Sequence, residues 1–406
     1  MTSAAAAFDA GRARRTLLVS LVCVGMGFTV LFPVLAPLGR EIGLSEIQIT
    51  FIISASGLVV FLTSPLWGRR SDRWGRKKVL LCGLFGFSAG TALFTCVLYA
   101  GLSAYLTGTV LFVALLASRM LHATMMSASM PAANAYMADI TDVSNRTRGM
   151  GAAGAANNLG TILGPAVAGL ALFSLLTPLW VMAALAFLNG LFIWRFLEEP
   201  PRQPMPAHAS AKLKYTDPRI LPFVVVGISM FTGLGLVQQT IGFRFQDALG
   251  LSAADTARNV GLAMGLAGCC SLFSQAVIVQ RFNLAPFTLM RVALPALVVA
   301  FVMMTLLESQ IALTAAMMVQ GLAMGLAGPG FTAGASLAVA PHEQGAVAGV
   351  AGSCGPLGFT LGPLLGGLMY QASPQLPYAF AAVLFCGLLV SMGWLGRRVS
   401  EHDAGD

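Results

Sequence analysis

The sequence predicts an all-α polytopic membrane protein, with twelve transmembrane helices arranged as two pseudo-symmetric six-helix bundles. The first observation is composition: 57% of the 406 residues are hydrophobic and 10% are charged, so most of the chain cannot solvate itself in water. The second is that apolar windows of about 20 residues, the length that crosses a bilayer, recur between short polar turns. The third is that patterns of the first half return in the second.

The predicted spans are read from these windows in chain order. The first follows a basic segment but is too long for the apolar region of a signal peptide, so we expect it to be retained. An even number of spans returns both termini to the same side. The expected limits are 16–38, 47–67, 79–100, 107–136, 149–174, 179–197, 219–243, 256–280, 287–307, 310–336, 346–370 and 377–396.

The longest polar stretch between spans divides the chain. It opens with Glu198-Glu199-Pro200-Pro201, a composition typical of a linker. We therefore expect bundles over residues 1–197 and 219–406, joined by a linker over 198–218, with a short tail after the last span.

Positive charge orients the predicted spans. Of the 24 Lys and Arg residues, 20 lie in segments on one side, whereas Arg40, Arg244 and Arg258 lie in loops on the other and Arg119 lies within span 4. Because cytoplasmic loops are enriched in these residues, both termini are expected in the cytoplasm of a cell's inner (plasma) membrane. The net charge of +8 is then a determinant of topology, and nothing suggests a nucleic-acid partner.

An internal repeat relates the two bundles. Gly164-Pro165 in span 5 returns as Gly362-Pro363 in span 11, at an offset of 198 residues. The same offset relates His122 to Gln320. Two spans in one register favour duplicated halves, and in transporters built from repeats the substrate site lies at the repeat interface.

Two motifs carry a family resemblance. A charged hairpin between spans 2 and 3 has the order G-x-x-x-D-R-x-G-R-K-K over residues 68–78, and span 5 has G-x8-G-x3-G-P-x3-G over residues 151–169. On these residues the chain resembles the major facilitator superfamily, in particular its drug:proton antiporter group. The span 4 signature of that group is met only at Arg119, since His122-Ala123 replaces its Gln-Gly.

The resemblance implies a cytoplasmic gate built on the hairpin. Its glycines are expected to permit tight turns and close helix approach, Asp72 to face the start of span 11, and Asp139 to pair with Arg76. An alternative is that these charges only fix topology. The predicted gate residues are Gly68, Asp72, Arg73, Gly75, Arg76 and Asp139.

The glycine pattern of spans 5 and 11 predicts close helix packing, and the prolines predict bends. We expect these spans to form a bending or sealing seam between the halves, although ordinary small-residue packing is an alternative. The predicted seam residues are Gly160, Gly164, Pro165, Gly358, Gly362 and Pro363.

Arg119 is the residue most costly to place, because a guanidinium within a span costs about 2.5–3.5 kcal/mol on insertion scales. It is expected to face a wet cavity, with His122 on nearly the same helix face and able to titrate near neutral pH. The alternatives are bonds from Arg119 to neighbouring carbonyls and a satisfied core histidine. Uncharged amides within spans are further candidates, either for the cavity or as contacts between helices: Asn134, Asn157, Asn158, Gln238, Gln239 and Gln320.

The absences narrow the function. No phosphate-binding loop is present, and the seven cysteines lie in apolar runs without metal-ligand spacing, so no cofactor, metal or enzymatic activity is expected. Val24 occupies the place where many proton-coupled exporters of the resembled family carry an acid. The resemblance implies a monomer that exports a small, drug-like molecule in exchange for protons. The single cation within a span, Arg119, favours an anionic or zwitterionic substrate. The alternative is a sugar-like or organic-anion facilitator or uptake symporter.

Overall fold

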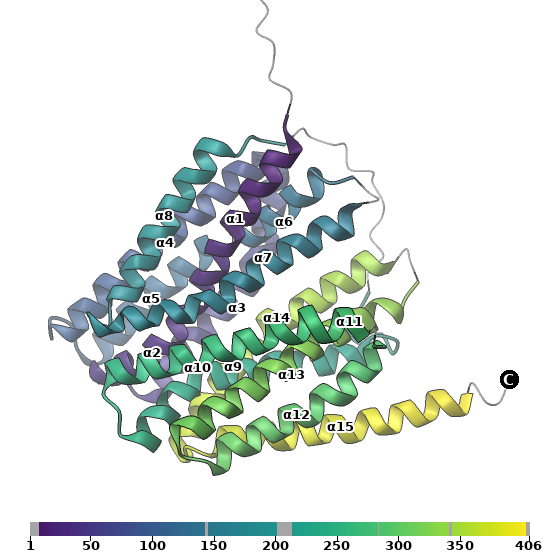
Figure 1. Ribbon diagram of the computed structural model, residues 1–406. Helices are drawn as coiled ribbons and strands as arrows, with labels where there is room; N and C mark the ends of the chain where they lie inside the picture. The colour runs from purple at the N-terminus through teal and green to yellow at the C-terminus, as the bar shows by residue number, and fades with distance from the viewer. Residues whose placement is uncertain (1–7, 143–144, 201–212, 283, 341–342, 403–406) are drawn as a thin grey trace, which may run out of the picture. The chain divides into compact units, whose positions relative to one another are not determined.

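The computed structural model describes residues 8–142, 145–200, 213–282, 284–340 and 343–402, and all of its regular structure is helical. Most of the predicted linker, residues 201–212, lies outside the described residues. The chain divides into two compact units, the first formed by Met1–Leu44 with Ala55–His208 and the second by Ser45–Ser54 with Ala209–Asp406. Figure 1 colours the first from purple to teal and the second from green to yellow, except for Ser45–Ser54, which fall in the purple part of the bar.

The helices of the first unit follow the predicted order, but two predicted spans are each built from two helices. The first span is α1 and α2, interrupted at Val30, and the fourth is α5 and α6, interrupted at Ser127 and Ala128. In both, a proline (Pro33 or Pro131) stands at the third position of the second helix. Proline has no backbone N–H, so it cannot donate a helical hydrogen bond to the residue four positions earlier. The elements are α1 Ala10–Thr29, α2 Leu31–Glu41, α3 Glu46–Trp74, α4 Arg76–Leu102, α5 Gly108–Met126, α6 Ser129–Asp139, α7 Arg146–Ala166, the 3-10 helix η2 Val167–Leu172 and α8 Thr177–Phe196.

The second unit has long helices with one irregular segment, a π-helical stretch that interrupts the eighth predicted span. Its elements are α9 Leu221–Leu249, α10 Ala253–Phe273, the π-helix η3 Ser274–Val279, α11 Gln280–Phe282, α12 Pro286–Leu306, α13 Gln310–Leu337, α14 Gln344–Ala372 and α15 Leu376–His402.

Eleven helical stretches among the described residues are long and apolar enough to cross a membrane. The first and fourth are the interrupted spans, Ala10–Glu41 and Gly108–Asp139. The last predicted span corresponds to a shorter apolar stretch, Leu376–Val390, within α15. The all-helical class is therefore confirmed, while the number twelve stays a prediction.

Arg244 corrects the predicted end of span 7. We expected it in an outer loop, but α9 continues to Leu249 and Arg244 is 2% exposed within it. Its guanidinium donates to the carbonyls of Met304 (3.3 Å), Thr305 (3.4 Å) and Leu307 (3.2 Å) and lies 3.3 Å from a carboxylate oxygen of Glu308. These carbonyls close the C-terminal end of α12, whose last groups have no partners within their own helix. A cation that looks like a loop residue is therefore a buried helix cap.

Removing this cap is expected to destabilise the second unit. Arg244→Gln loses bonds from a charged donor to three carbonyls, each worth about 1.5–3 kcal/mol before relaxation, so we expect a net loss of about 2–4 kcal/mol. Thermal denaturation of the purified wild type and variant in detergent measures this loss of stability. Arg258→Gln, at an exposed position of α10, is the control, and equal midpoints for the two variants would contradict the capping role.

Candidate functional site

The charged hairpin folds as a tight turn between α3 and α4. Gly75, between the two helices, has a φ of +106°, a conformation that favours glycine. A Cβ atom there would lie 2.8 Å from a carboxylate oxygen of Glu199. Gly68 differs from the prediction, because it lies inside α3 and a Cβ atom would meet only Pro131, at an ordinary 3.9 Å. Of these two glycines, only Gly75 is required by the turn.

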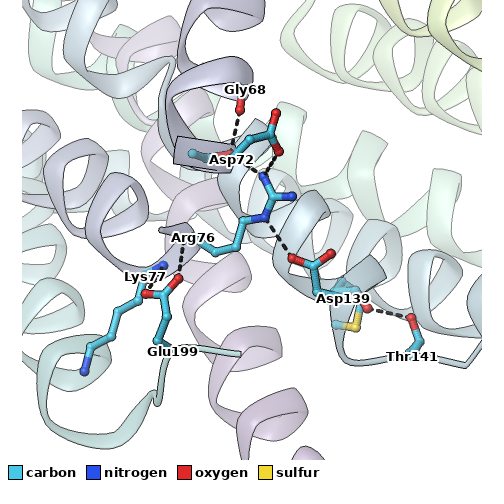
Figure 2. Close-up of polar contacts among 9 residues, drawn as sticks. Gly68, Asp72, Arg76, Lys77, Asp139, Thr141 and Glu199 are labelled. Atoms are coloured by element: carbon cyan, nitrogen blue, oxygen red, sulfur yellow. Dashed lines mark hydrogen bonds and ion pairs between the residues drawn. The ribbon is translucent and has the colours of Figure 1, made fainter. Parts of the chain in front are cut away.

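Arg76 is the centre of the hairpin's polar contacts (Figure 2). Its Nε lies 2.8 Å from Oδ2 of Asp139, the last residue of α6, as the resemblance implied. Its Nη1 lies 2.5 Å from Oδ1 of Asp72 and 2.7 Å from Oγ of Ser71. One guanidinium thus ties the start of α4 to the ends of α3 and α6. We call Asp72, Arg76 and Asp139 the hairpin cluster.

Glu199 also contacts the charged hairpin, and this contact was not predicted from the sequence. Its carboxylate accepts from the backbone N–H groups of Arg76 (2.5 Å) and Lys77 (3.1 Å), at the N-terminus of α4, where negative charge is favourable (Figure 2). Lys77 Nζ donates in return to the carbonyl of Trp194 at 2.9 Å. Glu199, which belongs to the acidic pair that opens the predicted linker, therefore caps the charged hairpin. The acidic pair before Pro200-Pro201 was the available signal.

The hairpin cluster predicts unequal couplings for its two ion pairs. Asp139 is 23% exposed and Asp72 is 44% exposed, so solvent screens the second pair more. In double-mutant cycles with Arg76→Gln, we expect Asp139→Asn to couple by about 1 kcal/mol and Asp72→Asn by about 0.4 kcal/mol. Thermal denaturation of the three single variants, the two double variants and the wild type measures both couplings. A larger coupling to Asp72 would contradict the pairing.

The second unit has an ionic cluster of its own before α9. The Arg219 guanidinium lies 2.8 Å from Glu343, at the start of α14, and 2.9 Å from Asp217. The hydrogen bond from the Arg219 side chain, together with that from its backbone N–H, lowers the pKa of Asp217 below its ordinary value. The cluster ties the chain that enters α9 to the chain that enters α14.

This cluster predicts a sensitivity to acid. Because the pKa of Asp217 is lower in the folded protein, its contribution to stability is complete above the unfolded value of about 3.9 and is lost as the pH falls through the folded value. Wild type and Arg219→Gln are therefore expected to differ in thermal midpoint at pH 7 and to converge below about pH 4. A difference that persists unchanged at pH 3 would contradict this origin.

Arg119 and His122 lie together in α5, as their spacing predicted. Arg119 Nη1 is 2.5 Å from Nδ1 of His122, and Nε2 of His122 is 3.3 Å from Oγ1 of Thr91 in α4. The guanidinium lies 5.7 Å from the ring centre of Phe94. His122 is 2% exposed and packs on Gly90, where any Cβ atom would lie 2.8 Å from it. Within the described residues, Arg119 Nε is buried without a hydrogen-bond partner.

The exposed face of α5 points away from this pair. Val110, Val113 and Leu121 are 64%, 54% and 51% exposed, at spacings that place them on one side of the helix. Arg119 is two positions before Leu121, a rotation of about 200°, so it lies on the opposite side. Arg119 is partly buried, and its guanidinium lies over the ring of Phe94 in α4. This cation is therefore turned away from the most exposed face of α5.

The predicted amides are distributed over both units. Asn134 lies in α6, Asn157 and Asn158 in α7, Gln238 and Gln239 in α9, and Gln320 in α13. Within the part of the chain that the structure describes, one buried polar atom is without a hydrogen-bond partner on each of the residues Asn157, Gln238, Gln239 and Gln320. Buried amides without partners are uncommon in proteins and indicate water or a ligand. Asn158 is exposed.

The predicted seam glycines make close contacts inside each unit. A Cβ atom on Gly160 would lie 2.0 Å from the carbonyl oxygen of Val22 in α1, and one on Gly164 would lie 2.5 Å from that of Met26. In the second unit, Gly358 and Gly362 pack in the same way on the backbone of α9. We had expected these contacts between the halves. The structure instead places them between α1 and α7 and between α9 and α14, because the repeated glycine pattern serves the same helix pair twice.

The prolines of the seam differ between the units. After Pro165 the α-helical geometry of α7 ends, and the chain continues as the 3-10 helix η2. Pro363 stays within α14, which runs unbroken to Ala372. A proline in a helix removes one backbone bond, and here only the first unit changes helix type near it.

Comparison with known proteins decides the family. The family model described as Major Facilitator Superfamily matches residues 17–352. The chain belongs to the Major Facilitator Superfamily. Its membership makes it a multi-pass membrane transporter rather than an enzyme.

Several relatives of this superfamily member are resistance proteins. The chain is 27% identical to "Multidrug resistance protein 1" of Bacillus subtilis (strain 168) over 93% of its own length and 95% of that protein. It is 26% identical to "Tetracycline resistance protein, class E" of Escherichia coli, over 93% of both. Among solved structures, a bacterial homolog of the human lysosomal transporter Spinster, inward-facing and occupied, has a TM-score of 0.74 at 14% identity, over 95% of this chain and 96% of that one. This last likeness concerns the fold.

Proposed function

We propose that this protein is a secondary active transporter that exports a small organic molecule, drug-like and anionic or zwitterionic, in exchange for protons. The observation that carries the proposal is the Arg119–His122 pair. It holds a cation and a titratable imidazole together on the side of a predicted span that lies opposite its most exposed residues. The names of the multidrug and tetracycline resistance relatives, matched over almost the whole chain, support export.

The proposed architecture is two six-span bundles, residues 1–197 and 219–406, that alternate around a cavity between them. Both termini lie in the cytoplasm, and the protein acts as a monomer in the inner membrane. The unpartnered amides of both units then contribute to the cavity, and the hairpin cluster acts as the cytoplasmic gate, with Arg73 beside it. An ion pair worth about 1 kcal/mol biases two conformations of similar energy without locking either.

Substrate-dependent pH change in proteoliposomes tests the proposal. A pH-sensitive dye is placed inside the vesicles, and a panel of candidate substrates that includes tetracycline is added outside. For each compound that is transported, protons are expected to move across the membrane in the direction opposite to the compound. His122→Ala is expected to uncouple this proton movement. Proton movement in the same direction as the substrate would contradict antiport.

The second candidate is a facilitator or uptake symporter for a sugar-like molecule or organic anion. It is favoured by the unpartnered amides Gln238, Gln239 and Gln320, which suit hydroxyl and carbonyl groups, and by Val24 in place of an acid. Counterflow that persists after the proton gradient is collapsed would favour the facilitator. Accumulation driven inward by a proton gradient would favour the symporter.

A further inference from the structure

The hydrogen bond between Arg119 and His122 fixes the protonation state of the imidazole. An arginine has only donors, so His122 Nδ1 must accept and therefore carries no proton. The proton of the neutral ring is then on Nε2, where it points to Oγ1 of Thr91. When His122 takes up a second proton, Nδ1 becomes a donor and Arg119 loses its acceptor. The bond seen in the structure and the protonated imidazole exclude each other.

We propose that Arg119 and His122 form a two-part site for a zwitterion, in which the substrate's anionic group binds Arg119 and its cationic group binds His122 Nδ1. This inference rests on the proposed proton antiport and names the substrate class. The anionic group draws the guanidinium away from the imidazole. The nitrogen that Arg119 has covered then accepts an N–H from the substrate's ammonium group.

The sign of the charge coupling selects a zwitterion over a simple anion. An anion at Arg119 also stabilises a protonated His122 beside it, so proton and anion bind together, which is the linkage of a symporter. Antiport requires the opposite, that substrate and proton exclude each other. A cationic group at Nδ1 supplies that exclusion, because it takes the place of the proton in both position and charge. A lone cation is excluded, since Arg119 repels it.

In the portion of the chain described by the structure, the helices packed around Arg119 and His122 place no other charged group against His122. His122 packs on α4, where Thr91, Gly90 and Phe87 face it without charge. The charged residues of α4 are Arg76, Lys77 and Lys78, all in its first turn. Helix α3, which bonds to α5 through Trp67, carries its charges in its first turn and its last two turns: Glu46, Arg69, Arg70, Asp72 and Arg73. No carboxylate among the described residues bonds Arg119.

The geometry limits the separation of the two substrate charges. Arg119 and His122 are three residues apart on one helix face and bond each other directly, so the groups that replace their mutual bond must stand close together, as in an α- or β-amino acid. The rings of Phe87 and Phe94 lie beside the pair and suit an apolar remainder. In the exchange, the protonated imidazole plus a zwitterion give the neutral imidazole with bound zwitterion, and one proton leaves to the water on the open side.

Three compounds with one skeleton test this inference on the purified full-length protein. Phenylalanine carries both charges, 3-phenylpropionate carries only the carboxylate and 2-phenylethylamine carries only the ammonium. Binding is measured by calorimetry from pH 5.5 to 8. As the pH falls and His122 takes up a proton, we expect phenylalanine to lose affinity by up to about tenfold per pH unit and 3-phenylpropionate to gain affinity. The amine is expected to bind most weakly.

Variants separate the two halves of the site. His122→Gln is expected to flatten both pH dependences to less than about twofold per unit, and Arg119→Gln to weaken both carboxylates at least about tenfold. Thr124→Ala is the control, because that hydroxyl bonds only a carbonyl of its own helix. Affinities that change in the same direction for phenylalanine and 3-phenylpropionate, slopes that survive His122→Gln, or no binding of either compound at about 10 mM would each overturn the inference.

The outcomes also separate this inference from the proposed function. Opposite pH dependences without antiport in proteoliposomes would support the zwitterion site and contradict proton-driven export. Antiport of a substrate that has no cationic group would do the reverse.

Discussion

Arg119→Gln is expected to reduce substrate-driven proton movement at least about tenfold while leaving the protein folded. Losing one charge-assisted hydrogen bond costs a bound anionic group about 1.5–3 kcal/mol, which corresponds to roughly 10- to 150-fold. The fold should not suffer, because a buried cation is itself costly and glutamine removes that cost. Initial rates in proteoliposomes and thermal denaturation in detergent, measured on the same preparations, provide the two readouts.

The two readouts distinguish function from structural bonding. If Arg119 served only to hold neighbouring helices, the glutamine variant would lose thermal stability, and residual transport would follow the folded fraction. Thr124→Ala, five residues further along α5, controls for a polar substitution in the same helix. Full transport in Arg119→Gln would remove this residue from the site.

Gly160→Ala is expected to prevent normal packing of α1 against α7, whereas Gly151→Ala in the same helix is expected to be tolerated. The new methyl at position 160 would lie 2.0 Å from a backbone carbonyl, which cannot rotate away, so the two helices must separate. Overpacking of this kind costs about 1–3 kcal/mol, and more where no side chain yields. At Gly151 nothing lies within 4 Å of the new methyl, and alanine favours a helix by up to about 1 kcal/mol.

Gly160→Ala and Gly151→Ala are matched variants, because both glycines belong to the same sequence signature. Their thermal midpoints in detergent, and the amount of folded protein recovered from membranes, are expected to move in opposite directions. Equal destabilisation of the two variants would mean that α7 requires glycine for another reason than close contact with α1.

The sequence was sufficient for features set by composition and local order. Long apolar windows predicted the helices, and the hairpin motif predicted the turn at Gly75, whereas the partner of Arg76 came from the family resemblance. The three-residue spacing of Arg119 and His122 placed them on one helix face. Each of these depends on period, propensity or a motif that is contiguous in the chain.

The features that were not predicted from the sequence depend on contacts between residues that are far apart in the chain. Arg244 looked like a loop cation because hydropathy does not show that the end of α12 supplies carbonyls to it. Glu199 caps a helix that begins 123 residues earlier, so the acidic pair to which it belongs does not show which helix it caps. Gly151 and Gly160 have the same sequence context, and only the position of α1 separates them.

The central claim is that the 119 side of α5 faces water and substrate rather than lipid. In a variant with all seven cysteines replaced, Arg119→Cys and Leu121→Cys place thiols at the same depth on opposite sides of the helix. We predict that a membrane-impermeant thiol reagent labels position 119, whereas position 121 reacts only with a lipid-soluble maleimide. Labelling of position 121 by the impermeant reagent, with position 119 reacting only from the lipid, would contradict the account.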